Sequence, residues 1–155
     1  MDRVHADSGV SVAVRQLRAA DEARWRTLWR GYLDFYKTDV PEDVTAETFA
    51  RLLNDQRYFV RLAESDGDVI GFVHCVFHPA TWSKTDYCYL EDLFVASAAR
   101  GLGAGRTLIE AVYDECDKRD AARVYWMTHK ENTVARRLYD KLATLSDFVQ
   151  YRRKT

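Results

Sequence analysis

The stretch that most constrains the fold of this chain is residues 87–107, which read Tyr-Cys-Tyr-Leu-Glu-Asp-Leu-Phe-Val-Ala-Ser-Ala-Ala-Arg-Gly-Leu-Gly-Ala-Gly-Arg-Thr. The first nine residues are rich in aromatic and branched side chains, which predicts a strand over 87–95. A glycine-rich turn follows over 100–105, and from Gly105 onward apolar residues recur at helical spacing. A strand, a glycine turn and a helix in this order form a cradle for phosphate, because free backbone N–H groups and the helix dipole favour an anion there.

The spacing of the glycines excludes two common phosphate-binding motifs. A P-loop needs G-x-x-x-x-G-K-[ST], but Gly101 to Gly105 is one residue too short and Arg106 replaces the lysine. The dinucleotide fingerprint also fails, because Arg106 occupies the position of its third glycine. What remains is R-x-x-G-x-G, formed by Arg100, Gly103 and Gly105. Alone, this pattern is equally typical of a glycine-rich turn before an ordinary helix.

Composition places the chain among single-domain globular proteins. With 155 residues, 47% apolar and 30% charged, we expect a tail over 1–9 and one domain over 10–155. The net charge of −1 argues against nucleic-acid binding by electrostatics. We also expect no signal peptide and no membrane span, because no apolar run reaches ~18 residues.

Cysteine and histidine spacing gives no sign of a metal site. Three cysteines, Cys75, Cys88 and Cys116, fit no zinc spacing. They are best interpreted as reduced core thiols of a cytoplasmic protein. His74 and His78 lie four residues apart without a third ligand nearby, which favours packing or surface histidines over metal binding.

Periodicity and turn signals predict an alternation of strands and helices. The expected strands cover residues 10–17, 58–64, 69–77, 87–95, 122–128 and 147–152. Helices are expected from residue 21, from residue 45 with Thr45 as its cap, from residue 105 and over 132–142. An Asp-Gly pair predicts a hairpin turn between the second and third strands.

Two segments near the first helix have both an ordinary and a functional interpretation. The helix beginning at residue 21 carries an aromatic face that is expected to pack in the core. Alternatively, Tyr32 and Tyr36 at its C-terminal end line a substrate pocket. The segment 34–47 holds five acidic residues against Lys37, which is typical of a solvated loop but also fits a funnel for a cationic acceptor.

A second motif gives the glycine turn its meaning. Residues 132–139 contain N-x-x-A-x-x-x-Y, as Asn132, Ala135 and Tyr139. The two motifs together, each following a strand and opening a helix, resemble the GNAT superfamily of N-acetyltransferases. The run Tyr-Leu-Glu-Asp-Leu-Phe-Val over 89–95 is most similar to the spermidine/spermine branch, and residues 125–129 are similar to yeast-type histone and polyamine acetyltransferases.

The resemblance implies an α/β (α+β) fold, with a mixed, mostly antiparallel sheet, helices on both faces and two central splayed parallel strands. It further implies acetyl-CoA as the co-substrate and no metal. The backbone of Leu93, Phe94 and Val95 would pair with the pantetheine arm. The residues implied to bind the rest of acetyl-CoA are Arg100, Gly101, Leu102, Gly103, Ala104, Gly105, Arg106, Asn132, Ala135 and Arg136.

Two side chains are candidates for moving protons. An alkyl ammonium has a pKa of ~10.4, so the acceptor must lose a proton before it attacks. The resemblance implies Glu91 as this base, acting through water, with Asp92 as the second choice and as a substrate-binding residue. Strict alternation places Tyr87, Tyr89, Glu91 and Leu93 on one face, although a bulge would exchange the faces. Tyr139 is the implied acid for the leaving thiolate, and a structural role for both carboxylates is the remaining alternative.

These observations predict direct transfer of an acetyl group to a primary amine, most simply a small cationic amine such as a polyamine. The alternatives are an idle acyl-CoA sensor and an acetyltransferase for a protein lysine or an amino acid. The resemblance also implies a homodimer, with the strand at 147–152 at its interface. Ser146 and Asp147 stand where family members often have a glycine, so this last strand departs from the family pattern.

Overall fold

The structure, a computed structural model, describes residues 11–155. A five-stranded sheet has the order β1-β2-β3-β4-β5. The strands are β1 (Val12–Gln16), β2 (Tyr58–Ser65), β3 (Asp68–His78), β4 (Tyr87–Val95) and β5 (Arg123–Tyr125). Neighbouring strands are antiparallel from β1 to β4, whereas β4 and β5 are parallel. The expected tail over 1–9 and the first residue of the expected first strand lie outside the described residues.

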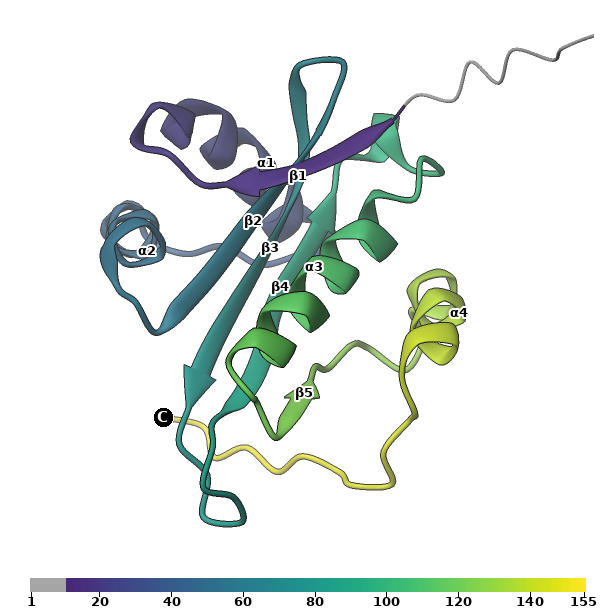
Figure 1. Cartoon of the computed structure of the whole chain (residues 1–155). Coiled ribbons are helices and arrows are strands. Elements are labelled where there is room, and N and C mark those ends of the chain that lie inside the picture. The colour runs from purple at the N-terminus through teal and green to yellow at the C-terminus, as the bar shows by residue number, and fades with distance from the viewer. Residues whose placement is uncertain (1–10) are drawn as a thin grey trace, which may run out of the picture.

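Helices cover both faces of this sheet (Figure 1). They are α1 (Glu22–Phe35), α2 (Glu42–Asn54), α3 (Ala104–Lys118) and α4 (Thr133–Leu142), with short 3-10 turns η1 (Ala19–Asp21) and η2 (Ser97–Ala99). Helix α3 lies against one face, while α1 and α2 lie against the other. The arrangement confirms the mixed α/β fold. No helix among the described residues is long and apolar enough to cross a membrane.

Each face of the sheet has its own hydrophobic core because strand side chains alternate in direction. On one side, α3 buries Leu108, Ile109 and Val112 against β3 and β4. On the other, the indole of Trp25 is fully buried and stacks on Trp29, with ring centroids 5.4 Å apart. The aromatic face of α1 therefore packs in the core, as predicted, and its polar atoms need partners there.

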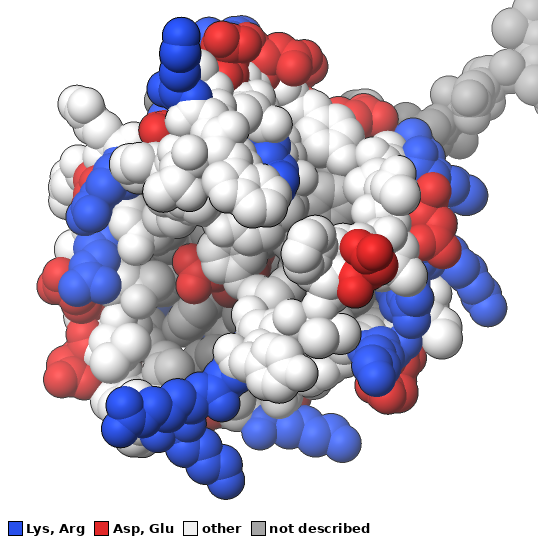
Figure 2. Space-filling view, turned by 90° about the horizontal axis from the view of Figure 1, so that it is seen from below, with Lys and Arg blue, Asp and Glu red and all other residues white. Residues whose placement is uncertain are grey.

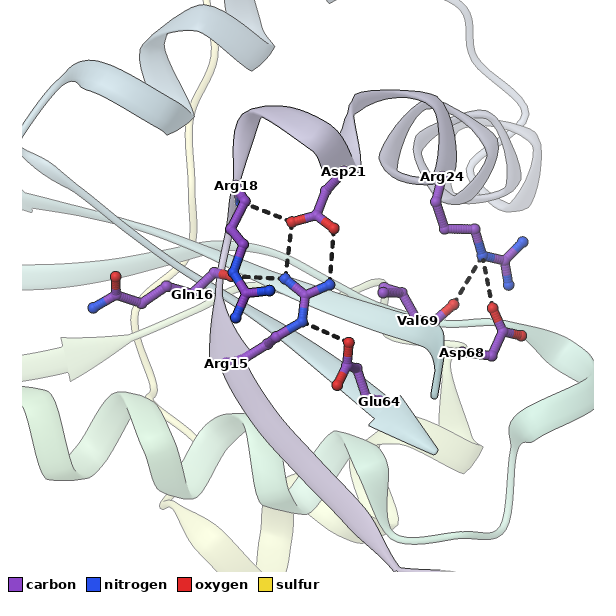
Figure 3. Close-up of polar contacts among 8 residues, drawn as sticks. All are labelled: Arg15, Gln16, Arg18, Asp21, Arg24, Glu64, Asp68 and Val69. Atoms are coloured by element: carbon purple, nitrogen blue, oxygen red, sulfur yellow. Dashed lines mark hydrogen bonds and ion pairs between the residues drawn. The ribbon is translucent and has the colours of Figure 1, made fainter. Parts of the chain in front are cut away.

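The hairpin between β2 and β3 forms as its Asp-Gly signal predicts. Asp66 and Gly67 have φ of 52° and 77°, the left-handed backbone that a two-residue hairpin turn requires. Nearby, Arg15 of β1 donates to both carboxylate oxygens of Asp21, each at 2.8 Å, and also to Glu64 of β2 (Figure 3). These bonds join the first strand, the turn before α1 and the neighbouring strand.

A β-bulge in β4 decides which side chains face the site. His74 of β3 is opposite Asp92, but the next residue of β3, Cys75, is opposite Leu90. Glu91 is thus the extra residue of the bulge. The prediction from strict alternation was wrong beyond this point. Leu93 packs on the α3 side of the sheet together with Leu90 rather than on the opposite face.

The parallel pair β4–β5 separates after a short contact. Tyr87, Cys88 and Tyr89 pair with residues 123–125, and the pairing ends there. Strand β5 is therefore shorter than the predicted 122–128, whereas β4 continues to Val95. The part of β4 beyond the bulge has no strand beside it on this side within residues 11–155, which is the predicted splay.

The starts of two helices and one predicted strand differ from what the sequence indicates. Helix α2 begins at Glu42 after Pro41, so Thr45 lies inside the helix and does not cap it. Asn132 stands at the N-cap position of α4, but its side chain makes no capping bond. The segment 147–152 is not a strand. It runs past the lower end of the sheet (Figure 1) with Phe148, Val149 and Tyr151 largely exposed, because no described strand lies beside it to form a ladder.

Candidate active site

A cavity of about 190 Å³ opens on the α1/α2 face of the sheet at the bulge in β4. Its walls come from α1, α2, β2, β3 and β4, through residues Trp29, Thr48, Arg51, Leu52, Tyr58, His74, Glu91 and Asp92. The bulge explains why two consecutive carboxylates line one cavity. In the view from below, acidic side chains lie inside a hollow whose walls are largely uncharged (Figure 2).

Asp92 is fixed by hydrogen bonds from two elements. The hydroxyl of Tyr32 donates to Asp92 Oδ1 at 2.7 Å, and Nδ1 of His74 lies 3.0 Å from Oδ2. His74 in turn accepts from the buried indole Nε1 of Trp25 at 3.1 Å. Burial and the charge of Asp92 raise the pKa of Tyr32 far above its usual range, so this hydroxyl stays protonated and continues to donate.

Glu91 occupies a different environment from Asp92. Reduced contact with water along the cavity wall and, secondarily, the charge of Asp92 raise the pKa of Glu91. A carboxylate whose pKa moves toward neutrality is a better proton acceptor than an unperturbed one. The two adjacent carboxylates are thus differentiated by their surroundings, which is the usual basis for separate roles.

Tyr36, just after α1, is close enough to both Asp92 and Tyr139 of α4 for their charges to affect one another. Burial raises the pKa of Tyr36, and Asp92 raises it further. Burial, with a smaller contribution from Tyr36, raises the pKa of Tyr139 to about 12. Tyr36 therefore lies within electrostatic reach of both Asp92 and Tyr139. The ring of Tyr139 packs edge-on against Trp126, with centroids 5.5 Å apart, which orients its hydroxyl.

The glycine turn before α3 has the geometry that an anion cradle needs. Gly101 and Gly103 have φ of 91° and 79°, and a Cβ built on either would meet no protein atom within 4 Å. The N–H of Thr107 bonds to the carbonyl of Gly103 at 3.0 Å, so the N–H groups before it lie at the open end of the helix. The open space beside these glycines fits the pyrophosphate of acetyl-CoA.

Each of the three arginines predicted to bind the phosphates already has a partner within the protein. Arg106 lies 3.6 Å from Glu110, and the guanidinium of Arg136 donates to the carbonyl of Lys130 at 2.7 Å. Arg100 stands over the ring of Phe35, 5.7 Å from its centroid. All three are near the surface, where a phosphate can compete for them. Leu102 is exposed, whereas Ala104 is buried and anchors the turn.

The second motif and β4 complete the predicted acetyl-CoA residues. Asn132 donates to the hydroxyl of Thr128 at 3.0 Å, and Ala135 is half-buried on α4. Phe94 packs beside α1 in the core around Tyr32 and Phe72, so only its backbone is offered to a ligand. The backbone of Leu93, Phe94 and Val95 lies in the splayed part of β4, and its pairing with pantetheine stays a prediction.

The cysteines and histidines do not form a metal centre in residues 11–155, where no group of three or more potential ligands is brought together. Cys75, Cys88 and Cys116 are buried free thiols. The hydrogen bond with the Cys88 thiol, and then burial, raise the pKa of Cys116 far above its usual range, which leaves it a poor nucleophile.

Comparison with known sequences assigns the family. The sequence pattern of the acetyltransferase (GNAT) family matches residues 22–143. The chain belongs to the GNAT family of acetyltransferases. The stretch includes β4, the α3 cradle and Tyr139, so the features described above are those of a GNAT N-acetyltransferase that uses acetyl-CoA.

Relatives of known sequence support the same assignment. This GNAT protein is 38% identical to D-amino-acid N-acetyltransferase HPA3 of Saccharomyces cerevisiae over 145 residues, which cover 92% of this chain and 90% of the relative. It is 32% identical to the N-acetyltransferase YhfO of Bacillus subtilis over 142 residues, covering 89% and 94%.

Solved GNAT structures share the fold. The aminoglycoside N-acetyltransferase AAC(6')-Iy in complex with CoA superimposes with a TM-score of 0.81 at 22% identity, over 96% of this chain and 97% of the other. A ribosomal-protein-alanine N-acetyltransferase from Brucella melitensis has a TM-score of 0.79 at 20% identity, over 94% and 100%.

Proposed function

We propose that this GNAT enzyme acetylates the α-amine of a free amino acid. The observation that carries the proposal is the composition of the cavity at the bulge, where Glu91 and Asp92 of β4 share one space with Arg51 of α2. Carboxylates suit an ammonium group, and a guanidinium suits a carboxylate. A zwitterionic acceptor therefore uses both parts of the cavity. The relative HPA3, named for D-amino acids, makes D enantiomers the first acceptors to test.

The acidic segment before and within α2 gives little support to attraction of a cation. Arg30 pairs with Asp34 and Asp39, each at 3.1 Å. Arg26 pairs with Glu42 at 2.6 Å, and Arg51 pairs with Glu47 at 3.1 Å. Because arginines neutralise most of this segment, the predicted acidic funnel is weakened. A polyamine-like acceptor remains the second candidate, on the strength of the adjacent Glu91 and Asp92 alone.

The proposed mechanism assigns one proton to each end of the reaction. Glu91, with its raised pKa, accepts the proton that the acceptor ammonium gives up, directly or through water, and the freed amine attacks the acetyl carbonyl. As the new C–N bond forms and the C–S bond breaks, the hydroxyl of Tyr139 donates to the leaving sulfur. Acetyl-CoA supplies the activated thioester, which would be held by the α3 cradle and the splayed backbone of β4.

A panel of acceptors tests the proposal. We expect D- or L-amino acids to be acetylated with a higher kcat/KM than spermidine, putrescine or the matching amines without a carboxylate. Arg51→Gln should raise KM for an amino acid and leave KM for the decarboxylated amine unchanged. Arg57→Gln, whose guanidinium is held by Asp55 at 2.7 Å, is the matched control. A panel in which spermidine has the highest kcat/KM contradicts the amino-acid assignment.

We infer a homodimer from the exposed apolar side chains of the C-terminal segment. Leu145, Phe148, Val149 and Tyr151 are 71–93% exposed, and within residues 11–155 no strand pairs with the outer side of β5. A second copy of this chain covers such surface by adding its own C-terminal segment. Light scattering at micromolar concentration should give the dimer mass, and Phe148→Asp should reduce it to the monomer. A monomeric mass for the unmodified protein contradicts the proposal.

The cytoplasm is the proposed location, because the three buried cysteines are all free thiols, as in proteins of reducing compartments. Fractionation of the native source, with detection by antibody, tests this placement. A secreted, oxidised form would contradict it.

A further inference from the structure

His74 of β3 lies where this strand meets β4 and α1. It is 1% exposed and stacks on Phe72, with ring centroids 4.2 Å apart and planes 4° from parallel. Its register places it opposite Asp92, one step before the bulge. A buried imidazole that contacts one carboxylate and one indole has each nitrogen committed to a different partner.

These partners fix where the proton of His74 sits. The indole N–H of Trp25 can only donate, so Nε2 of His74, 3.1 Å away, must accept and carries no hydrogen. The single ring proton is then on Nδ1, from where it is donated to Asp92 Oδ2 at 3.0 Å. A positively charged ring would place two N–H groups face to face at Trp25 and lose that bond.

The same logic fixes the state of Asp92. Oδ2 accepts from His74 and Oδ1 accepts from Tyr32 at 2.7 Å. Protonation of either oxygen would weaken the bond that it accepts, because a hydroxyl oxygen is a poorer acceptor than a carboxylate oxygen. Within residues 11–155, no comparable bond holds the carboxylate of Glu91, which lines the cavity beside Asp92.

We propose that Trp25, His74 and Tyr32 are positioning residues that hold Asp92 as a fixed carboxylate, so that Asp92 binds the acceptor ammonium and Glu91 alone takes its proton. The proposal deepens the proposed function and rests on the same acceptor cavity. It assigns the two neighbouring carboxylates to different steps, because each oxygen of Asp92 already accepts one protein hydrogen bond and keeps a lone pair for the ammonium, whereas Glu91 is free to be protonated. Trp25 lies two hydrogen bonds away from Asp92 and acts on it through His74.

Other charged and titratable groups lie around Asp92 and the cavity on each packed element. They are Tyr32 of α1, Tyr36 just after α1, Arg51 of α2, Tyr58 of β2, His74 of β3 and Glu91 of β4. Arg51 is the cation among them and pairs with Glu47 outside the cavity. The donors to Asp92 are uncharged, so Asp92 keeps its full negative charge for the acceptor.

Nuclear magnetic resonance of the ¹⁵N-histidine-labelled enzyme directly tests the series of hydrogen bonds from Trp25 through His74 to Asp92. We expect the His74 ring to give the signature of the neutral Nδ1–H tautomer at pH 7. A His74→Gln spectrum assigns the signal. An Nε2–H tautomer or a doubly protonated ring in the unmodified enzyme overturns the proposal whichever acceptor the enzyme uses.

Two matched tryptophan variants test the role of Trp25. Trp25→Phe keeps an aromatic ring but removes the N–H that holds Nε2 as an acceptor, so the pure Nδ1–H signature of His74 should be lost. Trp29→Phe makes the same exchange in the same stack. The N–H that it removes donates to Thr45 at 3.3 Å and not to His74, so the His74 signature should persist. Equal behaviour of the two variants would contradict the assigned role.

Kinetics tests the division of labour. Tyr32→Phe removes one donor to Asp92 and should raise the acceptor KM about tenfold, the equivalent of one hydrogen bond to a charged group. Its kcat should change much less. Glu91→Gln should show the opposite split, with kcat falling and KM retained. A Tyr32→Phe enzyme that loses kcat and keeps KM would overturn the proposal. Failure of the amino-acid panel alone would leave the tautomer result intact.

Discussion

Tyr139 is a weaker acid in this fold than tyrosine in water, because burial and then Tyr36 raise its pKa to about 12. An unperturbed alkyl thiol such as that of cysteine has a pKa of ~8.5, and the thiol of CoA is of the same kind. Complete proton transfer from Tyr139 to the thiolate is therefore uphill, so in the proposed mechanism its hydroxyl would stabilise the departing sulfur chiefly by a hydrogen bond.

Removal of this hydroxyl should slow the chemical step. Tyr139→Phe keeps the packing on Trp126, and we expect kcat to fall by ~10²–10⁴ with little change in acetyl-CoA affinity. Because Tyr139 loses its proton only near pH 12, the unmodified enzyme should show no fall in kcat from this group below about pH 10. Tyr113→Phe, which removes a hydroxyl bonded to the carbonyl of Leu142 at 2.8 Å, is the comparison. Near-normal turnover by Tyr139→Phe would make this tyrosine a packing residue.

Glu91 should set the acidic side of the pH profile. Its pKa is raised by burial and then by Asp92, and only the deprotonated form accepts a proton. Asp92→Asn removes the second cause, so the pKa of Glu91 should fall and the acidic limb of kcat/KM should move to lower pH. Glu91→Gln should abolish this limb and make activity depend on high pH. A limb that stays in place in Asp92→Asn would assign it to another group.

At the scale of elements, the cradle depends on left-handed backbone. Gly103 is the N-cap residue of α3 with φ of 79°, a conformation that costs other residues ~1–2 kcal/mol. Gly67 in the hairpin turn has almost the same φ, 77°, and similarly open surroundings. The two positions are therefore matched in strain but differ in whether a ligand lies beside them.

This match separates ligand contact from backbone strain. We expect Gly103→Ala and Gly67→Ala to lower the free energy of unfolding by similar amounts, while only Gly103→Ala weakens acetyl-CoA binding in calorimetry. The added methyl group occupies the space assigned to the pyrophosphate. If both variants bind acetyl-CoA equally well, the cradle is not the binding site.

Local sequence rules located most of the strands, helices and turns around the site. Periodicity and glycine spacing located β4, the turn and α3, and Asp-Gly located the hairpin. The bulge at Glu91 was not predictable in position, because it depends on pairing between β3 and β4. For the same reason His74 was interpreted as a packing or surface histidine, and Trp25 only as part of the aromatic core face of the first helix. A strand was wrongly predicted at 147–152, since propensity does not supply a partner strand.

At the scale of the whole molecule, Arg15 joins segments that are distant in the sequence. It is bonded to Asp21 before α1 and to Glu64 on β2, and the side chains of Arg15 and Asp21 are only 19% and 12% exposed. Partly buried, charge-assisted bonds of this kind contribute more than surface ion pairs. They attach β1 to the sheet edge and fix the start of α1.

The stability of the fold should therefore depend on Asp21 in acid. Its pKa is lowered chiefly by hydrogen bonds from Arg15, so its contribution is complete above the unfolded value near ~3.9 and is lost as the pH falls through the lower folded value. Asp21→Asn should cost about 1–3 kcal/mol at pH 7 and flatten the acid dependence in urea unfolding. Asp34→Asn, at an exposed pair with Arg30, should leave both unchanged. An unaltered acid profile in Asp21→Asn would exclude this role.

Helix α4 carries Tyr139 but buries none of its residues completely, and its C-terminal end is tied to α3 by the bond from Tyr113. An element with so little buried surface opens before the sheet does. Gentle warming should thus switch the enzyme off reversibly while circular dichroism still shows a native sheet. Saturating CoA, which would bridge α3 and α4, should move the inactivation midpoint upward toward the global melting temperature.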